Sequence, residues 1–345
     1  MPTIKKIIDH LESIAPPAYQ ESYDNAGLIT GQPAWEAKGA VLSLDATEEV
    51  VDEAIRQGFN MVIAHHPIVF KGLKQINGKN YVERAVIKAI KNDVAIYAIH
   101  TNLDNVYHQG INAKIAQKLG LENTRILAPK HLMKKMRAYI PGDEMGDLLM
   151  ALPKAGAANV NYSSENQVFI DQHEYFHEGK KLEISFPAGL QSSLTSLIKQ
   201  QSPNAYLEVQ DMEGPSPAIG SGMIGELAEE MTEMDFLTNL KSTMKTGCVR
   251  HTRLLNKLVK TVAVCGGAGS FLLPQAIRHR ADVFVTADYK YHEFFDADGQ
   301  IVIADIGHFE SEQYTIELLH EIISRKFPTF ALQNSKVTTN PVNYL

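Results

Sequence analysis

Residues 61–67 read MVIAHHP, an apolar run that ends in two adjacent histidines and a proline. The length and composition of MVIA are typical of a buried β-strand, and histidine is the most common transition-metal ligand. Open α/β sheets build their sites at the carboxyl ends of strands, where His65 and His66 would lie. The alternative is structural, with one histidine bonded to backbone and the other solvated. Other features of the sequence are needed to distinguish a metal-binding role of the two histidines from a structural one.

Other apolar runs along the chain also finish in polar groups. In the first half, AVLSLD ends in Asp45 and VAIYAIH ends in His100, with Asp104 four residues later. In the second half, three strand-like runs lead into CGGAGS, into DYKYHE with Asp288 and His292, and into GHFESE with His308 and Glu312. If these strands are mostly parallel, their carboxyl ends meet at one common edge.

Helical patterns separate most of these strands. The expected helices are an amphipathic N-terminal helix with its apolar stripe from Ile4 to Ile14, followed by segments at 47–58, 81–92, 110–119 and 309–325. Thr47 is a suitable N-cap and Gly58 a suitable C-terminal stop for the second of them. Alternating strands and helices predict an α/β core with mostly parallel strands flanked by helices.

The alternation breaks after Pro129. Residues 130–217 show shorter, mixed patterns typical of a small α+β domain, and EGPSPAIGSG at 213–222 is rich in the residues of a return linker. We therefore predict that residues 1–129 and 218–345 form one core that is interrupted by an inserted domain at 130–217. Neither half alone supplies the full set of polar strand ends.

Composition limits the function classes. With 345 residues, 44% hydrophobic and 21% charged, the chain has room for two or three domains of ordinary soluble type. The net charge of -7 gives no general reason to bind nucleic acid or an anionic membrane. Two cysteines are too few for a disulfide framework, and neither a signal peptide nor a membrane-spanning run is evident. A cytoplasmic location is the expectation.

The polar residues at the strand ends suit a metal site. Imidazoles mixed with carboxylates favour zinc, iron, manganese, nickel or cobalt over calcium or magnesium. His308 and Glu312 are four apart, so a helix would place both on one face, although a solvated surface pair has the same spacing. Adjacent histidines at a turn diverge, so His65 and His66 fit two neighbouring metals better than one. Carboxylates would then bridge the two cations.

Five stretches together resemble a known family. They are SYDNAGLITG at 22–31, IAHHPIVFKGL at 63–73, AIHTNLDN at 98–105, VTADYKYHE at 285–293 and IGHFESEQ at 306–313. This set resembles the Ngg-interacting-factor-three-like family, whose bacterial YbgI/YqfO-type members carry the name GTP cyclohydrolase 1 type 2 homologue. The resemblance covers the α/β portion on both sides of the insert. One departure is Ala287, which stands where the family pattern has glycine.

The resemblance implies a dinuclear metal centre inside a ring-shaped (toroidal) homohexamer. The implied ligands of two divalent ions per chain are His65, His66, Asp104, His308 and Glu312. The adjacent histidines would serve different metals and Glu312 would bridge them. Longer members carry an inserted domain similar to the PII and CutA proteins, so the insert is expected to be a ferredoxin-like, PII-like domain.

Several residues near the strand ends have open roles. His100 and His292 are candidates for proton transfer or for bonding to a ligand, and His100 suits a structural role equally well. Asp45 either orients a ligating imidazole or caps the helix beside Thr47. The loop CGGAGS suits close packing beside the site better than a phosphate cradle, since it matches neither the dinucleotide nor the P-loop pattern.

Two function classes remain. The first is a metal-dependent hydrolase acting on a small molecule, with a phosphorylated ligand as one option. The second is a noncatalytic hexameric scaffold, metal chaperone or regulatory protein, with the insert as its interaction module. Turnover by the metallated protein, and its loss on Glu312→Gln substitution, would separate them. Nucleic-acid binding inside the ring would require a basic lumen, against which the acidic total argues.

Overall fold

The computed structural model describes residues 1–130, 133–141, 145–165, 179–212 and 219–345. The chain divides into two compact units, one formed by Met1–Pro129 with Pro217–Leu345 and the other by Lys130–Ser216. The larger unit therefore consists of two segments that the smaller unit separates in sequence. All of the predicted site residues belong to the larger unit.

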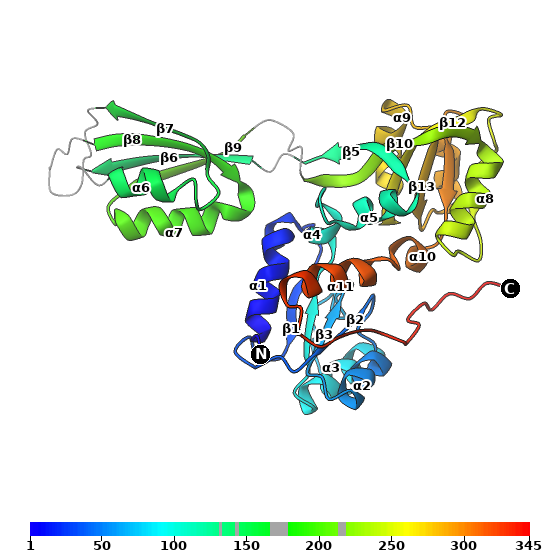
Figure 1. Cartoon of the computed structure of the whole chain (residues 1–345), viewed down its shortest axis with the longest axis horizontal. Coiled ribbons are helices and arrows are strands. Elements are labelled where there is room, and N and C mark those ends of the chain that lie inside the picture. Colours follow the sequence, from blue (N-terminus) through cyan, green and yellow to red (C-terminus); the bar gives the residue numbers. More distant parts are fainter. Residues whose placement is uncertain (131–132, 142–144, 166–178, 213–218) are drawn as a thin grey trace. The chain divides into compact units, whose positions relative to one another are not determined.

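The first sheet of the larger unit has five strands in the order β1-β4-β3-β2-β15 (Figure 1). β1 pairs antiparallel with β4, and the other three pairings are parallel. The strands are β1 (Gly27–Thr30), β2 (Ala40–Ser43), β3 (Met61–Ala64), β4 (Ala95–Ala98) and β15 (Leu332–Asn334).

Helices cover both faces of this sheet. Leu42 and Ile63 pack in one apolar cluster with α1 (Ile4–Ile14) and α11 (Thr315–Lys326). Their strand neighbours Val41 and Val62 point the other way, into a cluster with α2 (Glu48–Arg56) and α3 (Tyr81–Lys91). Because successive side chains of a strand alternate between faces, apolar runs such as MVIA are what a sheet buried on both sides requires.

The helices follow the predicted boundaries closely. Thr3, Thr47 and Asn80 are the N-caps of α1, α2 and α3, and each side chain accepts a hydrogen bond from a backbone N–H of the first turn. α5 (Ile111–Lys118) follows the short α4 (Thr101–Asp104) and corresponds to the helix expected at 110–119. These helix predictions are confirmed.

The second sheet has six strands in the order β11-β14-β13-β12-β10-β5. Only the neighbours β12, β13 and β14 pair in parallel, and the other pairings are antiparallel. The strands are β5 (Leu121–Pro129), β10 (Gly220–Thr232), β11 (Arg250–His251), β12 (Leu258–Ala268), β13 (Val283–Ala287) and β14 (Val302–Asp305), accompanied by α8 (Glu233–Thr243), α9 (Leu273–Arg278) and α10 (His308–Glu312).

The expectation of one common sheet edge is wrong. The six strands with polar ends divide between the two sheets, as β2-β3-β4 and as β12-β13-β14. Each trio is parallel, so each presents its own set of carboxyl ends. The second sheet as a whole is not mostly parallel, because β5, β10 and β11 join it antiparallel.

Two local predictions also need correction. The expected linker at 213–222 ends in strand β10, which begins at Gly220, while residues 213–218 lie outside the described residues. Gly220 is needed there because a Cβ would lie 2.4 Å from the carbonyl oxygen of Ala128 on β5. The helix expected at 309–325 is two helices, α10 and α11, which Gln313 and Tyr314 separate.

In its described residues, the smaller unit is a four-stranded antiparallel sheet with two α-helices. Its elements follow the order β6 (Met133–Pro141), α6 (Met145–Ala151), β7 (Ala158–Glu165), β8 (Gly179–Pro187), α7 (Gln191–Gln201) and β9 (Tyr206–Asp211). The sheet order is β7-β8-β6-β9, and every pairing is antiparallel. Leu148 of α6 and Leu194 of α7 pack with strand residues in one core of its own.

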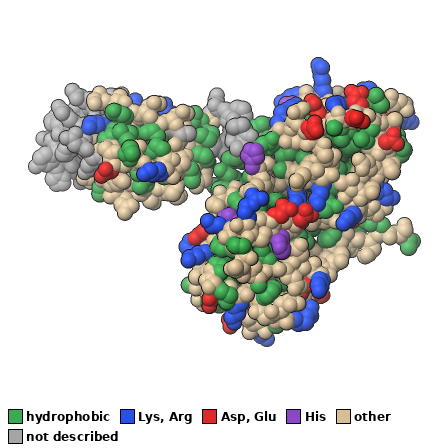
Figure 2. Space-filling model, in the orientation of Figure 1, with side chains coloured by type: hydrophobic (Ala, Val, Ile, Leu, Met, Phe, Trp, Pro, Cys, Tyr) green, Lys and Arg blue, Asp and Glu red, His purple; other side chains and the backbone are tan. Residues whose placement is uncertain are grey.

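Within the described ranges, no helix combines the length and the apolar character that crossing a membrane requires. Lys and Arg side chains are intermixed with Asp and Glu on the face of the molecule shown in Figure 2. This mixture agrees with the small net negative charge and offers no large basic surface on that face.

Candidate metal centre

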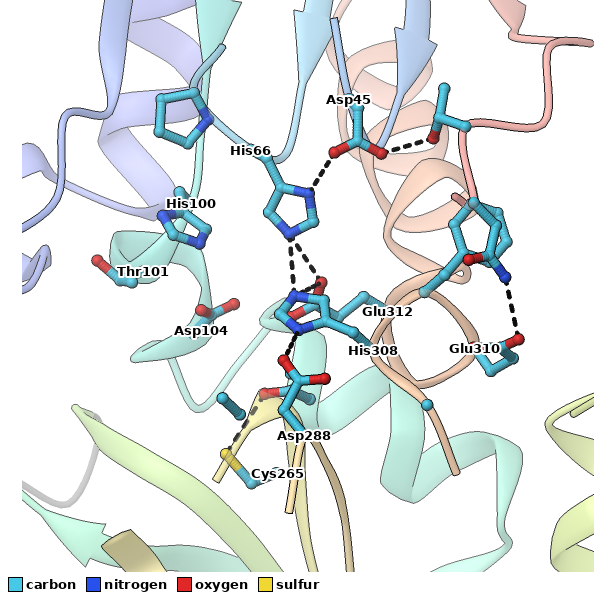
Figure 3. A pocket seen from close by; sticks show the side chains of 18 of the residues that line it. Asp45, His66, His100, Thr101, Asp104, Cys265, Asp288, His308, Glu310 and Glu312 are labelled. Atoms are coloured by element: carbon cyan, nitrogen blue, oxygen red, sulfur yellow. Dashed lines mark hydrogen bonds and ion pairs between the residues drawn. The ribbon is translucent and has the colours of Figure 1, made fainter. Parts of the chain in front are cut away.

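The polar strand ends of both sheets line one cavity of about 1100 Å³ in the larger unit. His66 follows β3 and Asp45 follows β2 in the first sheet, whereas Asp288 and His308 follow β13 and β14 in the second. Figure 3 shows His66 and His308 approaching each other from opposite sides. Two sets of strand ends therefore form the site that one sheet edge was expected to provide.

His65 and His66 diverge where β3 ends. His65 is fully buried, and its Nδ1 donates to the carbonyl oxygen of Ile99 at 2.8 Å. Nδ1 of His66 lies 2.9 Å from Oδ1 of Asp45. Each hydrogen bond at Nδ1 fixes the ring and leaves Nε2 available as a ligand atom. Asp45 therefore contacts an imidazole, as the orienting role requires, while Thr47 provides the helix cap.

His308 and Glu312 share one face of α10, as their spacing predicts. Nε2 of His308 lies 3.1 Å from Oε2 of Glu312. On the other side of the ring, Nδ1 of His308 lies 2.7 Å from Oδ2 of Asp288, so this carboxylate orients the imidazole in the way that Asp45 orients His66. Asp288 directly follows Ala287 at the end of β13 and adopts a positive φ of 57°.

The free ring atoms converge on Glu312. Its Oε2 lies 2.9 Å from Nε2 of His66, which in turn is 3.4 Å from Nε2 of His308. Its Oε1 lies 3.8 Å from Nε2 of His65, and that nitrogen is 3.7 Å from Oδ1 of Asp104. The five predicted ligands therefore lie together, and the two oxygens of Glu312 face different histidines.

Two of these atoms are buried without a hydrogen-bond partner, namely Nε2 of His65 and Oδ1 of Asp104. The distances of 3.7 and 3.8 Å around His65 are too long for hydrogen bonds. A buried, unsatisfied polar atom typically costs about 1–3 kcal/mol. A cation among these atoms would satisfy both, so the donor set fits a metal ion. Among the described residues, two groups of three have ligand atoms within 4.8 Å of one another, namely His65 with His66 and His100, and His66 with His308 and Glu312.

Burial and neighbouring charges shift the pKa values of the three histidines His65, His66 and His308 in different directions. Burial lowers the pKa of His65 to about 4, so its imidazole is neutral near pH 7, as a ligand must be. Burial also disfavours the charged form of His66, but hydrogen bonds with Asp45 and Glu312 raise its pKa to about 9. For His308, Asp288 and Glu312 outweigh burial in the same way and raise the pKa to about 11.

The two buried carboxyl groups shift in opposite directions. Burial, followed by repulsion from Glu312, raises the pKa of Asp104 well above its ordinary value. Burial acts in the same sense on Glu312, but the surrounding imidazoles of His65, His66 and His308 hold its pKa well below the ordinary value. Without a cation, the site therefore concentrates negative charge on Glu312.

Gly267 permits the close packing predicted for the CGGAGS loop. It adopts a φ of +66°, and a Cβ at this position would lie 2.4 Å from Oε1 of Glu312 and 3.3 Å from Cε1 of His308. Any other residue would therefore be strained in backbone and would displace the carboxylate. The helices after this loop are short, and Gly266 and Gly267 line the cavity beside the imidazoles.

His100 joins the site, whereas His292 lies apart. The ring centroid of His100 is 5.1 Å from that of His65, and its Nδ1 is 2.8 Å from Oδ1 of Asp24. Burial opposes ionisation of Asp24, but hydrogen bonds from His100 and Thr101 lower its pKa to about 2. His292 is exposed, contacts the rings of Tyr291 and Phe295, and is not among the described residues that line the cavity.

Some residues of the site had no assigned role in the sequence. Asp24 belongs to the SYDNAG stretch, and Asp288 follows a predicted strand. These positions indicated that both residues lie near the site, but they did not indicate which histidine each one contacts. Thr339, which bonds to Asp45, and Arg250, which lines the cavity, lie in segments without a recognisable motif. Cys265 also lines the cavity, where burial raises the pKa of its thiol, and it packs in an apolar cluster.

Comparison with known proteins places this site in a family. Residues 2–341 match the model of the Duf34/NIF3 (NGG1p interacting factor 3) family. The chain belongs to this family. The Duf34/NIF3 relatives include a protein of Staphylococcus aureus strain MSSA476, 32% identical over 99% of this chain and 100% of the relative, and one of Bacillus subtilis strain 168, 31% identical over 99% and 98%. Both carry the name GTP cyclohydrolase 1 type 2 homolog.

Solved structures show the same Duf34/NIF3 fold. A Bacillus cereus protein related to NIF3 matches 100% of this chain and 99% of its own with a TM-score of 0.80 and 33% identity. The protein ybgI matches with a TM-score of 0.64, over 99% of this chain and 100% of its own, at 16% identity, which supports the fold alone.

Proposed function

We propose that the chain binds two divalent cations and acts as a metal-dependent hydrolase. The first ion would be held by His65, Asp104 and Oε1 of Glu312, and the second by His66, His308 and Oε2 of Glu312. The observation that carries this proposal is the placement of Glu312, whose two oxygens face separate histidines. A carboxylate in this position bridges two cations and offsets their repulsion. Zinc, iron, manganese, nickel and cobalt suit this donor set.

The space beside these residues supports a substrate site rather than a structural metal. Structural metal sites are closed, whereas catalytic sites keep positions open to water and substrate. Here His66, His308 and Glu312 line a cavity of about 1100 Å³, which has room for a small molecule. Two bound divalent cations supply Lewis acidity, which makes a water nucleophilic near neutral pH and stabilises negative charge on a phosphoryl or carbonyl oxygen.

Residues of the chain would handle the proton and the ligand. His100 lines the cavity with its Nδ1 held by Asp24, so its other nitrogen is oriented to take up a proton from the attacking water. Arg250 is the one lysine or arginine among the described residues that line the cavity, and half of its side chain is exposed. Nη2 of Arg250 pairs with Asp305 and donates to the carbonyl oxygen of Tyr289, so its other N–H groups would contact an anionic, for example phosphorylated, ligand. The exposed position of His292 gives no support to a catalytic role.

The test is a substrate panel on anaerobically purified, fully metallated protein. Phosphoesters, nucleotides and cyclic amides cover the bonds that this site would hydrolyse. We expect turnover of one of these classes, its loss in Glu312→Gln, and its retention in His251→Ala, which alters an exposed histidine of β11 outside the cavity. A fully metallated protein without turnover would favour the noncatalytic scaffold or chaperone instead.

We further propose a ferredoxin-like, PII-like fold for the smaller unit. Its element order β6-α6-β7-β8-α7-β9 and its antiparallel sheet order β7-β8-β6-β9 support this assignment. A solved structure of this unit would test the assignment, and we expect α6 and α7 to cover one face of its sheet.

The proposal extends to the oligomeric state of the protein and to its cellular compartment. We propose a ring-shaped homohexamer in the cytoplasm. The exposed, mutually contacting rings of Tyr291 and Phe295 support an interface between subunits. Both cysteines are unpaired, which suits a reducing compartment. Sedimentation of the metallated chain would test the assembly, and a monomer would contradict it.

A further inference from the structure

The C-terminal segment, residues 335–345, is anchored to the first sheet where it begins. The backbone N–H of Ser335 donates to the carbonyl oxygen of Leu42 at 2.8 Å. The buried carboxylate of Glu53 on α2 accepts from the Ser335 hydroxyl at 2.6 Å and from the Lys336 N–H at 3.0 Å. From this anchor the segment continues into the wall of the cavity, which Thr339, Asn340 and Tyr344 help to line.

Thr339 bonds directly to the carboxylate that orients His66. Its hydroxyl donates to Oδ2 of Asp45 at 2.6 Å, while Oδ1 of Asp45 lies 2.9 Å from Nδ1 of His66. Both oxygens of this carboxylate are therefore fixed, one by the segment and one by the imidazole. A short hydrogen bond to an ionised carboxylate is among the stronger ones in proteins, so Thr339 restrains the rotation of Asp45.

The segment also contacts the helix that carries the other predicted ligands. Nδ2 of Asn340 donates to Oε1 of Glu310 on α10 at 3.1 Å. Further along, a Cβ on Gly307, the N-cap of α10, would lie 2.7 Å from the hydroxyl oxygen of Tyr344. The segment thus joins the first sheet, which holds His66, to the start of α10, which holds His308 and Glu312.

We propose that the C-terminal segment completes the metal centre and that Thr339 is a positioning residue, which holds His66 through Asp45 for the ion at His66, His308 and Glu312. This inference rests on the proposed two-metal function. It adds a part of the chain that has no motif and that contributes no ligand of its own. Thr338, next to Thr339, is exposed and provides a matched control in the same segment.

The experiment is a cobalt(II) titration of the metal-free, full-length protein, followed by visible absorption. We expect two ions per chain in the wild type. Thr339→Val removes the hydroxyl and keeps the shape of the side chain. It should lower the cobalt affinity of one of the two sites on the order of tenfold, which is the lower end of the losses seen when a residue that orients a metal ligand is changed. Thr339→Ser, which restores a hydroxyl, should recover most of the affinity, and Thr338→Val should match the wild type.

A double-mutant cycle separates positioning from general packing. In an Asp45→Ala background the hydroxyl has no carboxylate to hold, so Thr339→Val should cause no further loss of cobalt affinity. Urea unfolding in a chelator reports whether each metal-free variant is folded. A wild-type affinity in Thr339→Val, equal losses at both sites, or an additive loss in the Asp45→Ala background would overturn the inference. A wild type that binds fewer than two ions would instead contradict the proposed function.

Discussion

Nε2 of His66 lies 2.9 Å from Oε2 of Glu312, although the two residues are 246 positions apart in the chain. His66 follows strand β3 of the first sheet, and Glu312 lies on a helix, α10, that follows strand β14 of the second. The site therefore exists only when both sheets have folded and packed. Because the smaller unit interrupts the larger one in sequence, between β5 and β10 of the second sheet, metal binding would report on the assembly of the larger unit from its two segments.

Asp104→Asn should separate stability from metal binding. Oδ1 of Asp104 is buried without a hydrogen-bond partner, and burial raises the pKa of this carboxyl group well above its ordinary value. In a chelator, the neutral amide should therefore stabilise the folded protein by about 1 kcal/mol, because it has no ionised form for burial and Glu312 to destabilise. Urea unfolding measures this difference.

The same variant should lose the ion at His65. With saturating zinc the order of stabilities should reverse, since the wild type gains binding free energy that the variant lacks. A metal-free Asp104→Asn protein that is less stable than the wild type would show that the carboxylate has a structural partner. A variant that still binds two ions would remove Asp104 from the ligand set.

Gly267→Ala should abolish tight metal binding. The added Cβ would lie 2.4 Å from Oε1 of Glu312, so the carboxylate has to move away from the position in which it would bridge two cations. Gly299→Ala is the matched control, because Gly299 has nearly the same φ, +64°, but nothing within 4 Å of an added Cβ. Both variants should lose about 1 kcal/mol of stability to backbone strain, and only Gly267→Ala should lose metal.

Isothermal titration with zinc and urea unfolding in a chelator compare the two variants. Equal metal affinities would show that Glu312 tolerates displacement, and the bridging role would then be untenable. A similar loss of metal in both variants would point to backbone strain rather than to contact with the carboxylate.

Much of the fold and of the site follows from local sequence signals. MVIA and AIYA, and AVLS up to its last residue Ser43, are apolar because helices cover both faces of their sheet, and each strand ends where a polar side chain enters the cavity. His308 and Glu312 meet because one helical turn places them on one face. These features depend on residues close in sequence, so the pattern alone predicts them.

The division into two sheets depends on contacts between distant residues. β10 contains Gly220, Gly222 and Gly225, a composition typical of a loop. It is a strand because it pairs with β5 and β12, and β5 approaches Gly220 and Gly225 too closely for side chains. Likewise, Asp24 holds His100, and Thr339 holds Asp45, across 76 and 294 positions. No local periodicity encodes such pairs, which tertiary packing alone brings together.

The attachment of the C-terminal segment should depend on pH through Glu53. Burial opposes ionisation of this carboxyl group, but hydrogen bonds from Ser335, Lys336 and Gln333 lower its pKa below the ordinary 4.5. A lowered folded-state pKa stabilises the protein above pH 4.5, and this contribution is lost as the pH falls through the folded-state value. Glu53→Gln should therefore be destabilised at pH 7, and the difference should shrink below pH 4.5.

Urea unfolding of the metal-free proteins between pH 7 and 3.5, a range chosen to span the ordinary carboxylate pKa, measures this difference. Glu49→Gln, an exposed position of the same helix, controls for the loss of one negative charge. A difference between wild type and Glu53→Gln that grows towards low pH would mean that the folded-state pKa is raised, contrary to the hydrogen bonds that Glu53 accepts.

The central claim is that His65 and His66 bind different ions that share Glu312. Its most direct test is the metal content per chain of anaerobically purified protein. We predict two ions in the wild type, one in His65→Ala, one in His66→Ala and none in the double variant, with two retained in His292→Ala, whose exposed ring lies outside the cavity. Two ions retained in the double variant, or both ions lost from only one of the single variants, would contradict the claim.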